Sequence, residues 1–341
     1  MIRDAVVRLI DGHDLSREEA RAAMNEIMAG DASQVQIAGF LVALRAKGET
    51  PDEIAGCAEA MREHVLRVRP RRPDLVDIVG TGGDGANTFN ISTAAALVAA
   101  AAGAGIAKHG NRAASSASGA ADVLEALGFR LEQPAERIER SIDELGFGFL
   151  FAQAHHPAMR HAAPVRRELA TRTVFNVLGP LTNPAGARAL MLGVYSPELT
   201  RTLADALVRL GVARAYVVHG AGGIDELSPL GPNLVCEVAD GSVREYELEP
   251  LELGIARCAP EELRGGDPAS NAAALRRVLA GEDRSGHRSA VVLNAAGGIA
   301  AAGRAESLRE GLALAAEAID SGAAAARLEQ LVAFTQEEAA A

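Results

Sequence analysis

The first part of the chain has the polar and apolar spacing of helices only. Two segments, Ser16-Arg17-Glu18-Glu19 and Thr50-Pro51-Asp52-Glu53, place a hydroxyl three residues before a glutamate, which is the capping-box pattern of a helix start. Between them, apolar residues recur at roughly helical spacing, at Val35, Ile37, Phe40, Leu41 and Leu44. Residues 67–73 are rich in arginine and proline and are predicted to be a linker. Residues 1–68 therefore predict a small helical unit.

After the linker, short apolar segments alternate with helical patterns. The predicted strands are residues 76–79, 105–107, 147–151, 190–195, 215–218, 234–238 and 290–293. Helices between successive strands indicate crossover connections and a mainly parallel sheet. Residues from about 160 to 185 interrupt this alternation with a helix and a turn rich in glycine and proline at 179–184. The alanine-rich tail after Gly322 predicts a further helix, so the fold class is α/β with a helical N-terminal part.

Composition and charge narrow the class of protein. The chain has 341 residues, of which 48% are hydrophobic and 23% charged, and its formal net charge is −11. This acidic balance argues against a nucleic-acid partner, which requires a basic face. The three cysteines have no paired spacing, the N-terminus lacks a signal-peptide pattern, and the alanine-rich run after Thr93 is too short to span a bilayer. We expect a cytoplasmic protein with no membrane partner.

The first polar segment with candidate chemistry is a glycine-rich loop at residues 80–85, directly after the predicted strand 76–79. Asn90-Ile91-Ser92-Thr93 follows, and then a helix that is expected to end near Ala102, with Ser92 or Thr93 as its N-cap. Glycines let a backbone approach an anion closely, and the helix dipole adds partial positive charge at the same point. The loop is therefore predicted to bind phosphate.

Two other phosphate-binding motifs fit this loop less well. Gly80, Gly82 and Gly85 satisfy the G-x-G-x-x-G spacing of dinucleotide-binding folds, but that motif needs an acidic residue about 20 positions later. The chain has no Asp or Glu between Asp84 and Asp122. A P-loop is excluded because no Gly-Lys-Ser/Thr follows the glycines.

A second polar loop, residues 108–118, follows the next predicted strand. It supplies Lys108, Asn111, Arg112 and three serines, and Ser118 is a candidate cap for the next helix. One such loop is usually only a solvated connection between a strand and a helix. Two in succession, at the carboxyl ends of neighbouring parallel strands, favour a ligand site.

These loops, together with later segments, resemble the anthranilate phosphoribosyltransferase family. The resemblance rests on Gly-Thr-Gly-Gly-Asp (80–84), Asn-Ile-Ser-Thr (90–93) and Lys-His-Gly-Asn-Arg (108–112) with the serines after it. It continues through residues 155–159, 166–169, 172–176, 179–184, 218–220 and 225–227, in family order and over about the whole chain. The family joins anthranilate to the ribose of phosphoribosyl pyrophosphate and releases pyrophosphate, in tryptophan biosynthesis.

The resemblance implies a fold and an assembly. It implies a fold like that of nucleoside phosphorylases and such phosphoribosyltransferases, with a small discontinuous helical domain of residues 1–70 to which residues 160–185 return. The larger α/β domain comprises residues 74–159 and 186–341, and the active site lies between the two. Family members pair as homodimers through the helical domain. The resemblance also implies Mg²⁺, which neutralises pyrophosphate oxygens and prefers carboxylate, hydroxyl and water ligands.

Site residues are carried over by motif match. The resemblance implies a phosphoribosyl pyrophosphate site of Gly80, Gly83, Asp84, Thr88, Asn90, Ile91, Ser92, Thr93, Lys108, His109, Gly110, Asn111, Arg112, Ala113, Ala114, Ser115, Ser116 and Ala120. It implies an anthranilate site of Gly80, Asn111 and Arg166, and a metal site of Ser92, Asp225 and Glu226. Ala120 and Gly222 depart from the family pattern, which often has serine and aspartate at these positions.

The chemical roles are assigned with alternatives left open. The aryl amine of anthranilate is unprotonated at neutral pH, so no strong base is required, and His109 is the candidate catalytic residue for positioning or for accepting a proton. Arg166 is expected to bind the carboxylate through charged hydrogen bonds, although charge alone would also allow Arg167. His155, His156 and His161 have no neighbouring Cys or acid, which disfavours zinc. A pyrimidine nucleoside phosphorylase and a nucleic-acid-binding relative are the rival functions.

Overall fold

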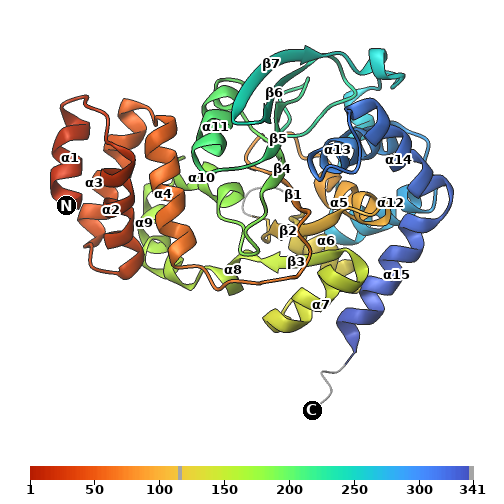
Figure 1. Ribbon diagram of the computed structural model, residues 1–341, viewed down its shortest axis with the longest axis horizontal. Coiled ribbons are helices and arrows are strands. Elements are labelled where there is room, and N and C mark those ends of the chain that lie inside the picture. Colours follow the sequence, from red (N-terminus) through yellow and green to blue (C-terminus); the bar gives the residue numbers. More distant parts are fainter. Residues whose placement is uncertain (114–116, 338–341) are drawn as a thin grey trace.

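The computed structural model describes residues 1–113 and 117–337. Four helices form a bundle at one end of the molecule: α1 (Ile2–Ile10), α2 (Arg17–Ala29), α3 (Gln34–Lys47) and α4 (Pro51–Glu63) (Figure 1). Both predicted capping boxes are confirmed. At α2, the Ser16 hydroxyl accepts the Glu19 N–H at 3.2 Å while the Glu19 carboxylate accepts the Ser16 N–H at 2.8 Å.

A seven-stranded sheet forms the centre of the molecule. Its strands are β1 (Leu75–Gly80), β2 (Gly105–Gly110), β3 (Phe147–Phe151), β4 (Ala189–Gly193), β5 (Arg214–His219), β6 (Asn233–Ala239) and β7 (Ser242–Leu248), in the order β3-β2-β1-β4-β5-β6-β7. The first five strands are parallel, and only β6 and β7 are antiparallel to their neighbours. The predicted mainly parallel sheet is confirmed.

Helices cover both faces of the sheet. The helices after the bundle are α5 (Ile91–Ala101), α6 (Ala120–Ala126), α7 (Ala135–Leu145), α8 (Ala152–His155), α9 (Ala163–Leu169), α10 (Phe175–Leu178), α11 (Glu198–Arg209), α12 (Pro268–Leu279), α13 (Gly286–Ala301), α14 (Leu308–Asp320) and α15 (Ala323–Gln336). Short 3-10 helices are η1 (Pro157–His161), η2 (Gly179–Leu181), η3 (Pro250–Leu253) and η4 (Pro260–Leu263). Figure 1 shows α5 and α12–α15 on the side of the sheet away from the bundle.

Alternation along the strands explains this two-sided packing. On β4, Ala189 and Met191 join the apolar core with α5 and α13, whereas Leu190 and Leu192 join the core formed with α11 and the bundle. Residues 160–185 contribute Val165, Leu178 and other apolar side chains to the bundle's core. The predicted α/β fold with a helical N-terminal part is confirmed, and none of the described helices has the length and apolar character to cross a membrane.

One predicted strand is wrong. Residues 290–293 lie inside helix α13, which is buried along nearly its whole length. A short apolar run in a fully buried helix has the same composition as a buried strand, so periodicity cannot separate them. Two glycines of this helix allow close packing on the sheet, because a Cβ on Gly298 would lie 2.3 Å from Ile78 and one on Gly297 2.5 Å from Met191.

Strand β7 was missed by the sequence prediction. It pairs with β6 through a two-residue turn at Asp240 and Gly241, whose φ angles are 51° and 72°. This Asp-Gly pair is a strong hairpin signal, since positive φ at both positions is what a type I′ turn requires. Most of β7 is exposed or half-buried, so it lacks the apolar run by which the other strands were found.

Two predicted helix caps are also wrong. Helix α5 begins at Ile91 with Asn90 as its N-cap, two residues before the predicted Ser92. Helix α6 has Gly119, and not Ser118, as its N-cap. A Cβ on Gly119 would lie 2.4 Å from the Ala113 nitrogen, so the close approach of the two chain segments requires glycine there.

Candidate active site

Acidic side chains lie over the carboxyl ends of β1 and β4, where the strand order changes direction. The loop after β5 carries Asp225 and Glu226 to this point. A Cβ on Gly80 would lie 2.2 Å from the Asp225 carboxylate, and a Cβ on Gly193 would lie 1.5 Å from the Asp225 carbonyl. The two strands therefore end in glycine because the acidic loop occupies the space of their side chains. Such a crevice at a switch point is the usual ligand site of open α/β sheets.

The acidic residues perturb one another. The Asp225 carboxylate accepts the Gly82 N–H at 2.6 Å, and the Asp225 N–H donates to the Asp84 carboxylate at 3.3 Å. Burial, and then the neighbouring Asp84, raise the pKa of Asp225 to about 8. Burial and Asp225 raise the pKa of Glu226 well above its usual range. The three carboxyl groups are thus so close together that ionisation of all of them at once is disfavoured.

Lys108 supplies the nearest cation to this acidic cluster. Its ammonium is buried, donates to the Ile78 carbonyl at 2.7 Å and to the Ser92 hydroxyl at 3.3 Å, and interacts electrostatically with Asp225 and Glu226. Burial lowers the pKa of Lys108. One buried ammonium does not balance three carboxylates, so the cluster is suited to a further cation.

The donor chemistry of the cluster fits Mg²⁺. Carboxylates of Asp84, Asp225 and Glu226 and the hydroxyl of Ser92 are hard oxygen ligands, which Mg²⁺ prefers. Among the described residues, no three His, Cys, Asp or Glu side chains already converge on a point that would hold a metal ion. The carboxylates gathered at the strand ends would therefore have to close around the ion on binding.

The glycine loop has the backbone conformation that only glycine adopts easily. Gly82, Gly83 and Gly85 have φ angles of 70°, 79° and 75°. A Cβ on Gly82 or Gly85 would meet nothing within 4 Å, so the constraint is backbone strain and the need for open approach. The guanidinium of Arg172 donates to the Gly83 carbonyl and stacks on the Tyr195 ring at 4.0 Å from its centroid. Sequence reasoning assigned no role to Arg172.

The second half of this loop is held by the chain before α12. Thr88 pairs with Arg264 in an isolated antiparallel bridge. The Asn90 side chain donates to the Ser118 carbonyl at 3.0 Å and accepts from the Asn271 amide at 2.9 Å. Asn90 thus connects the two predicted phosphate loops with each other and with α12. Among the described residues, no side chain caps α5 at Asn90. The Ile91 N–H bonds to the Phe89 carbonyl at 2.7 Å, and the Ser92 N–H faces the Glu226 carboxylate, so the acidic cluster lies at the start of this helix.

The second loop is described only in part, because Ala114, Ser115 and Ser116 lie outside the described residues. Asn111 accepts from the Arg112 N–H at 2.8 Å and from the Gln153 amide at 3.3 Å. The Arg112 guanidinium turns toward α6 and pairs with Asp122 and Glu125. Its charge is therefore already partnered, which the sequence did not indicate.

The other predicted loop residues lie on or next to the helices and strands that flank the two loops. Ile91 and Thr93 are buried in the first turn of α5, Gly110 ends β2, Ala113 donates to Asp122, and Ala120 begins α6. The Thr93 hydroxyl has no hydrogen-bond partner among the described residues.

His109 is a buried imidazole with both ring nitrogens hydrogen-bonded. Its Nδ1 lies 3.2 Å from the Gly179 carbonyl, which can only accept, so Nδ1 carries the proton. Its Nε2 then accepts from Nε2–H of His156, also at 3.2 Å. Burial, and then the neighbouring His156, lower the pKa of His109 to about 3. The ring is therefore neutral at physiological pH, and its only lone pair is occupied.

Arg166 lies in the last turn of α9 beside an aromatic ring. Its guanidinium is half-buried over Phe175, 5.1 Å from the ring centroid, and burial lowers its pKa. Among the described residues, no carboxylate pairs with it. Arg167, by contrast, is exposed. A buried cation without an anion, next to an aromatic surface, is suited to an aromatic carboxylate. No direct contact joins Arg166 to Asn111 or Gly80 among the described residues.

The other histidines of this region have structural partners. His155 is buried and its Nδ1 lies 2.9 Å from the Leu66 carbonyl, and the His161 ring packs against Gly30 at the end of α2. Two buried polar residues were overlooked by the sequence reasoning: Asp77 in the middle of β1, and Asn183. An aspartate inside the apolar run of residues 75–79 was a usable signal, because such residues are rarely buried without partners.

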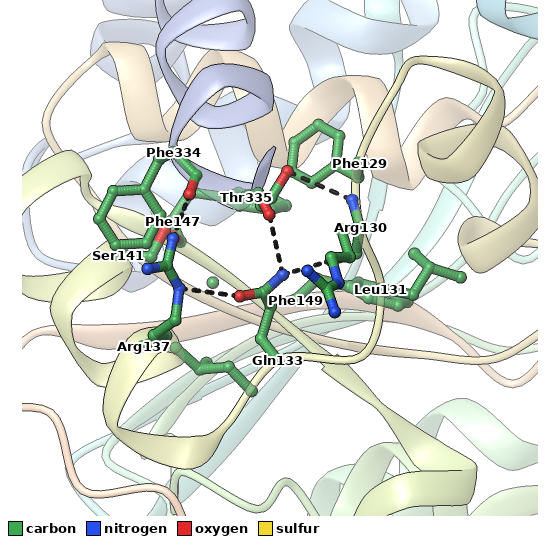
Figure 2. A pocket seen from close by; sticks show the side chains of 12 residues that line it. Phe129, Arg130, Leu131, Gln133, Arg137, Ser141, Phe147, Phe149, Phe334 and Thr335 are labelled. Atoms are coloured by element: carbon green, nitrogen blue, oxygen red, sulfur yellow. Dashed lines mark hydrogen bonds between the residues drawn. The ribbon is translucent and has the colours of Figure 1, made fainter. Parts of the chain in front are cut away.

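A small cavity lies away from these loops, between α7, β3 and α15. Figure 2 shows Arg137, Gln133 and Thr335 around it, joined by hydrogen bonds among themselves and with the Phe334 carbonyl. The volume of this cavity is about 20 Å³, which is enough for about one water molecule. This cavity is therefore not a candidate substrate site.

Comparisons with known proteins show the family to which the chain belongs. Residues 72–325 match the model of the glycosyl transferase family a/b domain, and residues 3–65 match that of its helical bundle domain. An anthranilate phosphoribosyltransferase of Pelotomaculum thermopropionicum is 54% identical over 335 residues, which are 98% of this chain and 97% of that protein.

Solved structures of such enzymes are also similar to this chain over nearly its whole length. The crystal structure of anthranilate phosphoribosyltransferase from Thermus thermophilus has a TM-score of 0.93 and 56% identity, covering 98% of this chain and 100% of that one. The enzyme from Saccharomyces cerevisiae in complex with PRPP and Mg has a TM-score of 0.87 and 32% identity, covering 98% and 97%.

Proposed function

The chain belongs to the glycosyl transferase family whose full-length relatives are anthranilate phosphoribosyltransferases, and we propose how its residues perform that reaction. It transfers the phosphoribosyl group of phosphoribosyl pyrophosphate to anthranilate, giving N-(5-phosphoribosyl)anthranilate and pyrophosphate. The observation that carries the assignment of roles is the convergence of a glycine loop, the N-terminus of α5, Lys108 and three carboxylates at the ends of β1 and β4.

The glycine loop and the start of α5 bind the phosphate groups. The loop has no side chains to block anion approach, and the N–H groups and dipole of α5 favour negative charge. The second loop contributes Asn111 and the backbone around Ala113. Arg112 orders that loop through Asp122 and Glu125, and it contacts phosphate only if it leaves these acids.

Mg²⁺ is held by Ser92, Asp225 and Glu226, with Asp84 close to Asp225. The ion supplies neutralisation of the pyrophosphate charge that develops as the bond to ribose C1 breaks. The Gly82 N–H already bonds to Asp225, so the acidic loop and the glycine loop are joined before any ligand binds. The protein's own contribution is to gather carboxylates, Lys108 and the N-terminus of α5 on the side where the leaving group's charge develops.

Anthranilate binds between Arg166 and the phosphoribosyl site. The Arg166 guanidinium bonds to the carboxylate, while Asn111 and the Gly80 backbone complete the acceptor site. This assignment is supported by the unpaired, half-buried state of Arg166 and by Phe175 beneath it.

His109 positions groups and does not accept the substrate proton. Its Nδ1–H is bonded to Gly179 and its Nε2 accepts from His156, so proton transfer would require a bond to break. The nucleophilic aryl amine needs no strong base, which makes a fixed neutral imidazole sufficient.

The protein acts as a homodimer that pairs through the helical domain. Helices α1 and α3 expose Val7, Ile10, Val35 and Val42, with exposed fractions of 47% to 83%. A Cβ on Gly39 of α3 would lie 3.7 Å from Val6 of α1, so the two helices pack against each other. Large exposed apolar side chains on neighbouring helices suit an interaction surface.

The division into domains and the cellular setting complete the proposal. The helical domain comprises residues 1–70 and 160–185, and the α/β domain comprises residues 74–159 and 186–341. The buried free cysteines Cys57 and Cys236 suit the reducing cytoplasm, and the reaction serves tryptophan biosynthesis.

The test is loss of anthranilate fluorescence on adding phosphoribosyl pyrophosphate and Mg²⁺. The same reaction with a chelator and no added Mg²⁺ is the matched control and should be slow. Release of a free base from a pyrimidine nucleoside and phosphate, with no anthranilate consumption, would instead show a nucleoside phosphorylase. Binding to nucleic acid that weakens steeply with salt would support the non-enzymatic rival.

A further inference from the structure

The strands that carry the two phosphate loops separate before they end. β1 pairs with β2 only at Leu75 and Val76, opposite Gly105 and Ile106. Beyond this point β1 continues to pair with β4 as far as Gly80, and β2 continues to pair with β3 as far as Gly110. The sheet is therefore split between β2 and β1, the second and third strands of the order, next to the two phosphate loops that follow them.

Side chains satisfy the backbone groups that the split exposes. The His109 N–H donates to the Asp77 carboxylate at 3.2 Å. The Asn183 amide donates to the other oxygen of Asp77 at 2.7 Å and to the Ala107 carbonyl at 2.8 Å. The Lys108 ammonium donates to the Ile78 carbonyl of β1. Buried backbone groups need such partners, so the split is a built feature of the sheet.

The partners of Asp77 and Asn183 lie on both sides of Lys108. Asn183 holds the carbonyl of residue 107, and Asp77 holds the N–H of residue 109. Asp77 is 0% exposed and Asn183 6% exposed, and both contacts of Asp77 come from N–H donors, which suits an ionised carboxylate. Asn183 comes from the segment that returns to the bundle, so the pair also joins that segment to β1 and β2.

We propose that Asp77 and Asn183 are positioning residues for phosphoribosyl transfer. Together they hold β2 away from β1 and fix the backbone around Lys108, so that its ammonium faces Ser92 and the acidic cluster. Neither touches substrate in this account, and the inference rests on the proposed site at the ends of β1 and β4. Because Lys108 faces the side where the leaving group's charge develops, displacing it should act on turnover more than on substrate binding.

The test uses Asp77→Asn and Asn183→Ala in the full-length protein. The first places an amide donor against the Asn183 donor, and the second removes both bonds made by Asn183. A displacement of about 1 Å at a reacting group can cost about a hundredfold in rate, so kcat should fall roughly tenfold to a hundredfold. The KM values for both substrates should stay within about threefold, because the interaction is made mainly in the transition state.

Ser141→Ala is the matched control. Its buried hydroxyl donates to the Phe147 carbonyl at 2.7 Å, at the amino end of β3, whereas the phosphate loops follow the carboxyl ends of β1 and β2 (Figure 2). This variant should lower the unfolding temperature and leave kcat unchanged, as a purely structural bond would.

The outcomes separate the inference from the proposed function. Folded Asp77 or Asn183 variants with wild-type kcat, or with losses confined to KM, would overturn the positioning role. Should Asp77→Asn fail to fold, Asn183→Ala alone decides, and failure of both would show a folding role only and also refute the proposal. A wild-type protein that does not consume anthranilate would instead refute the proposed function itself.

Discussion

Replacing Arg166 tests the acceptor site most selectively. Arg166→Ala removes a guanidinium that stacks on Phe175 and, among the described residues, has no carboxylate partner. A charge-assisted hydrogen bond to a carboxylate is worth about 1.5–3 kcal/mol, so the KM for anthranilate should rise roughly tenfold to a hundredfold. The KM for phosphoribosyl pyrophosphate should change little, because the groups that bind this substrate lie at β1, α5 and β2.

The same variant should leave stability nearly unchanged. Loss of the stacking contact costs about 0.5–1 kcal/mol, and removal of a half-buried charge without a partner offsets part of this. The assay is steady-state fluorescence with each substrate varied in turn, accompanied by a thermal unfolding curve. Arg167→Ala is the matched control, because Arg167 is the exposed neighbour with the same charge.

Two results would refute this reasoning. Equal effects of Arg166→Ala and Arg167→Ala would show that net charge, and not a specific contact, attracts anthranilate. A rise in the KM for phosphoribosyl pyrophosphate alone would show that Arg166 binds phosphoribosyl pyrophosphate and not anthranilate.

Two further predictions concern the metal and the buried histidines. Asp225→Asn should lower Mg²⁺-dependent turnover by roughly a hundredfold, because a metal contact supplies several kcal/mol of charge stabilisation. Circular dichroism should show an intact fold. An unchanged rate and Mg²⁺ dependence would show that Asp225 is not part of the metal site. Burial lowers the pKa of His156 to about 4, below the value of about 6.5 in the unfolded chain, so its contribution to stability is present above pH 6.5 and lost as pH falls toward 4. Unfolding free energies measured across this range should fall by up to about 1.4 kcal/mol per pH unit for this group, and His156→Gln should flatten the slope; an identical slope in the variant would contradict the buried neutral histidine.

Much of the fold could be predicted because local signals agreed with tertiary structure. The capping boxes at Ser16 and Thr50 need only residues three positions apart, and both formed. The parallel strands are buried on both faces, so they appear in the sequence as continuous apolar runs. The strand prediction for residues 290–293 was wrong for the same reason, because a helix buried on every side also gives a continuous apolar run.

The site was predictable in its parts but not in its connections. Motifs placed the glycine loop, Lys108 and the acidic pair at neighbouring strand ends, and the structure brings Gly82, Asp84 and Asp225 into contact. The pairing of Arg112 with α6 depends on side-chain directions that no spacing reveals. The pair of Asp77 and Asn183 is separated by 106 positions, and only the path of the return segment brings them together.

Calorimetric titration with phosphoribosyl pyrophosphate and Mg²⁺ tests the central claim most directly, using the wild-type protein and Gly82→Val. Gly82 has a φ of 70° and no atom within 4 Å of an added Cβ, so valine strains the backbone and blocks the anion's approach without a clash in the core. The account predicts saturable binding to the wild type and none to a folded Gly82→Val. A folded Gly82→Val that binds like the wild type would show that this loop is not the anion site.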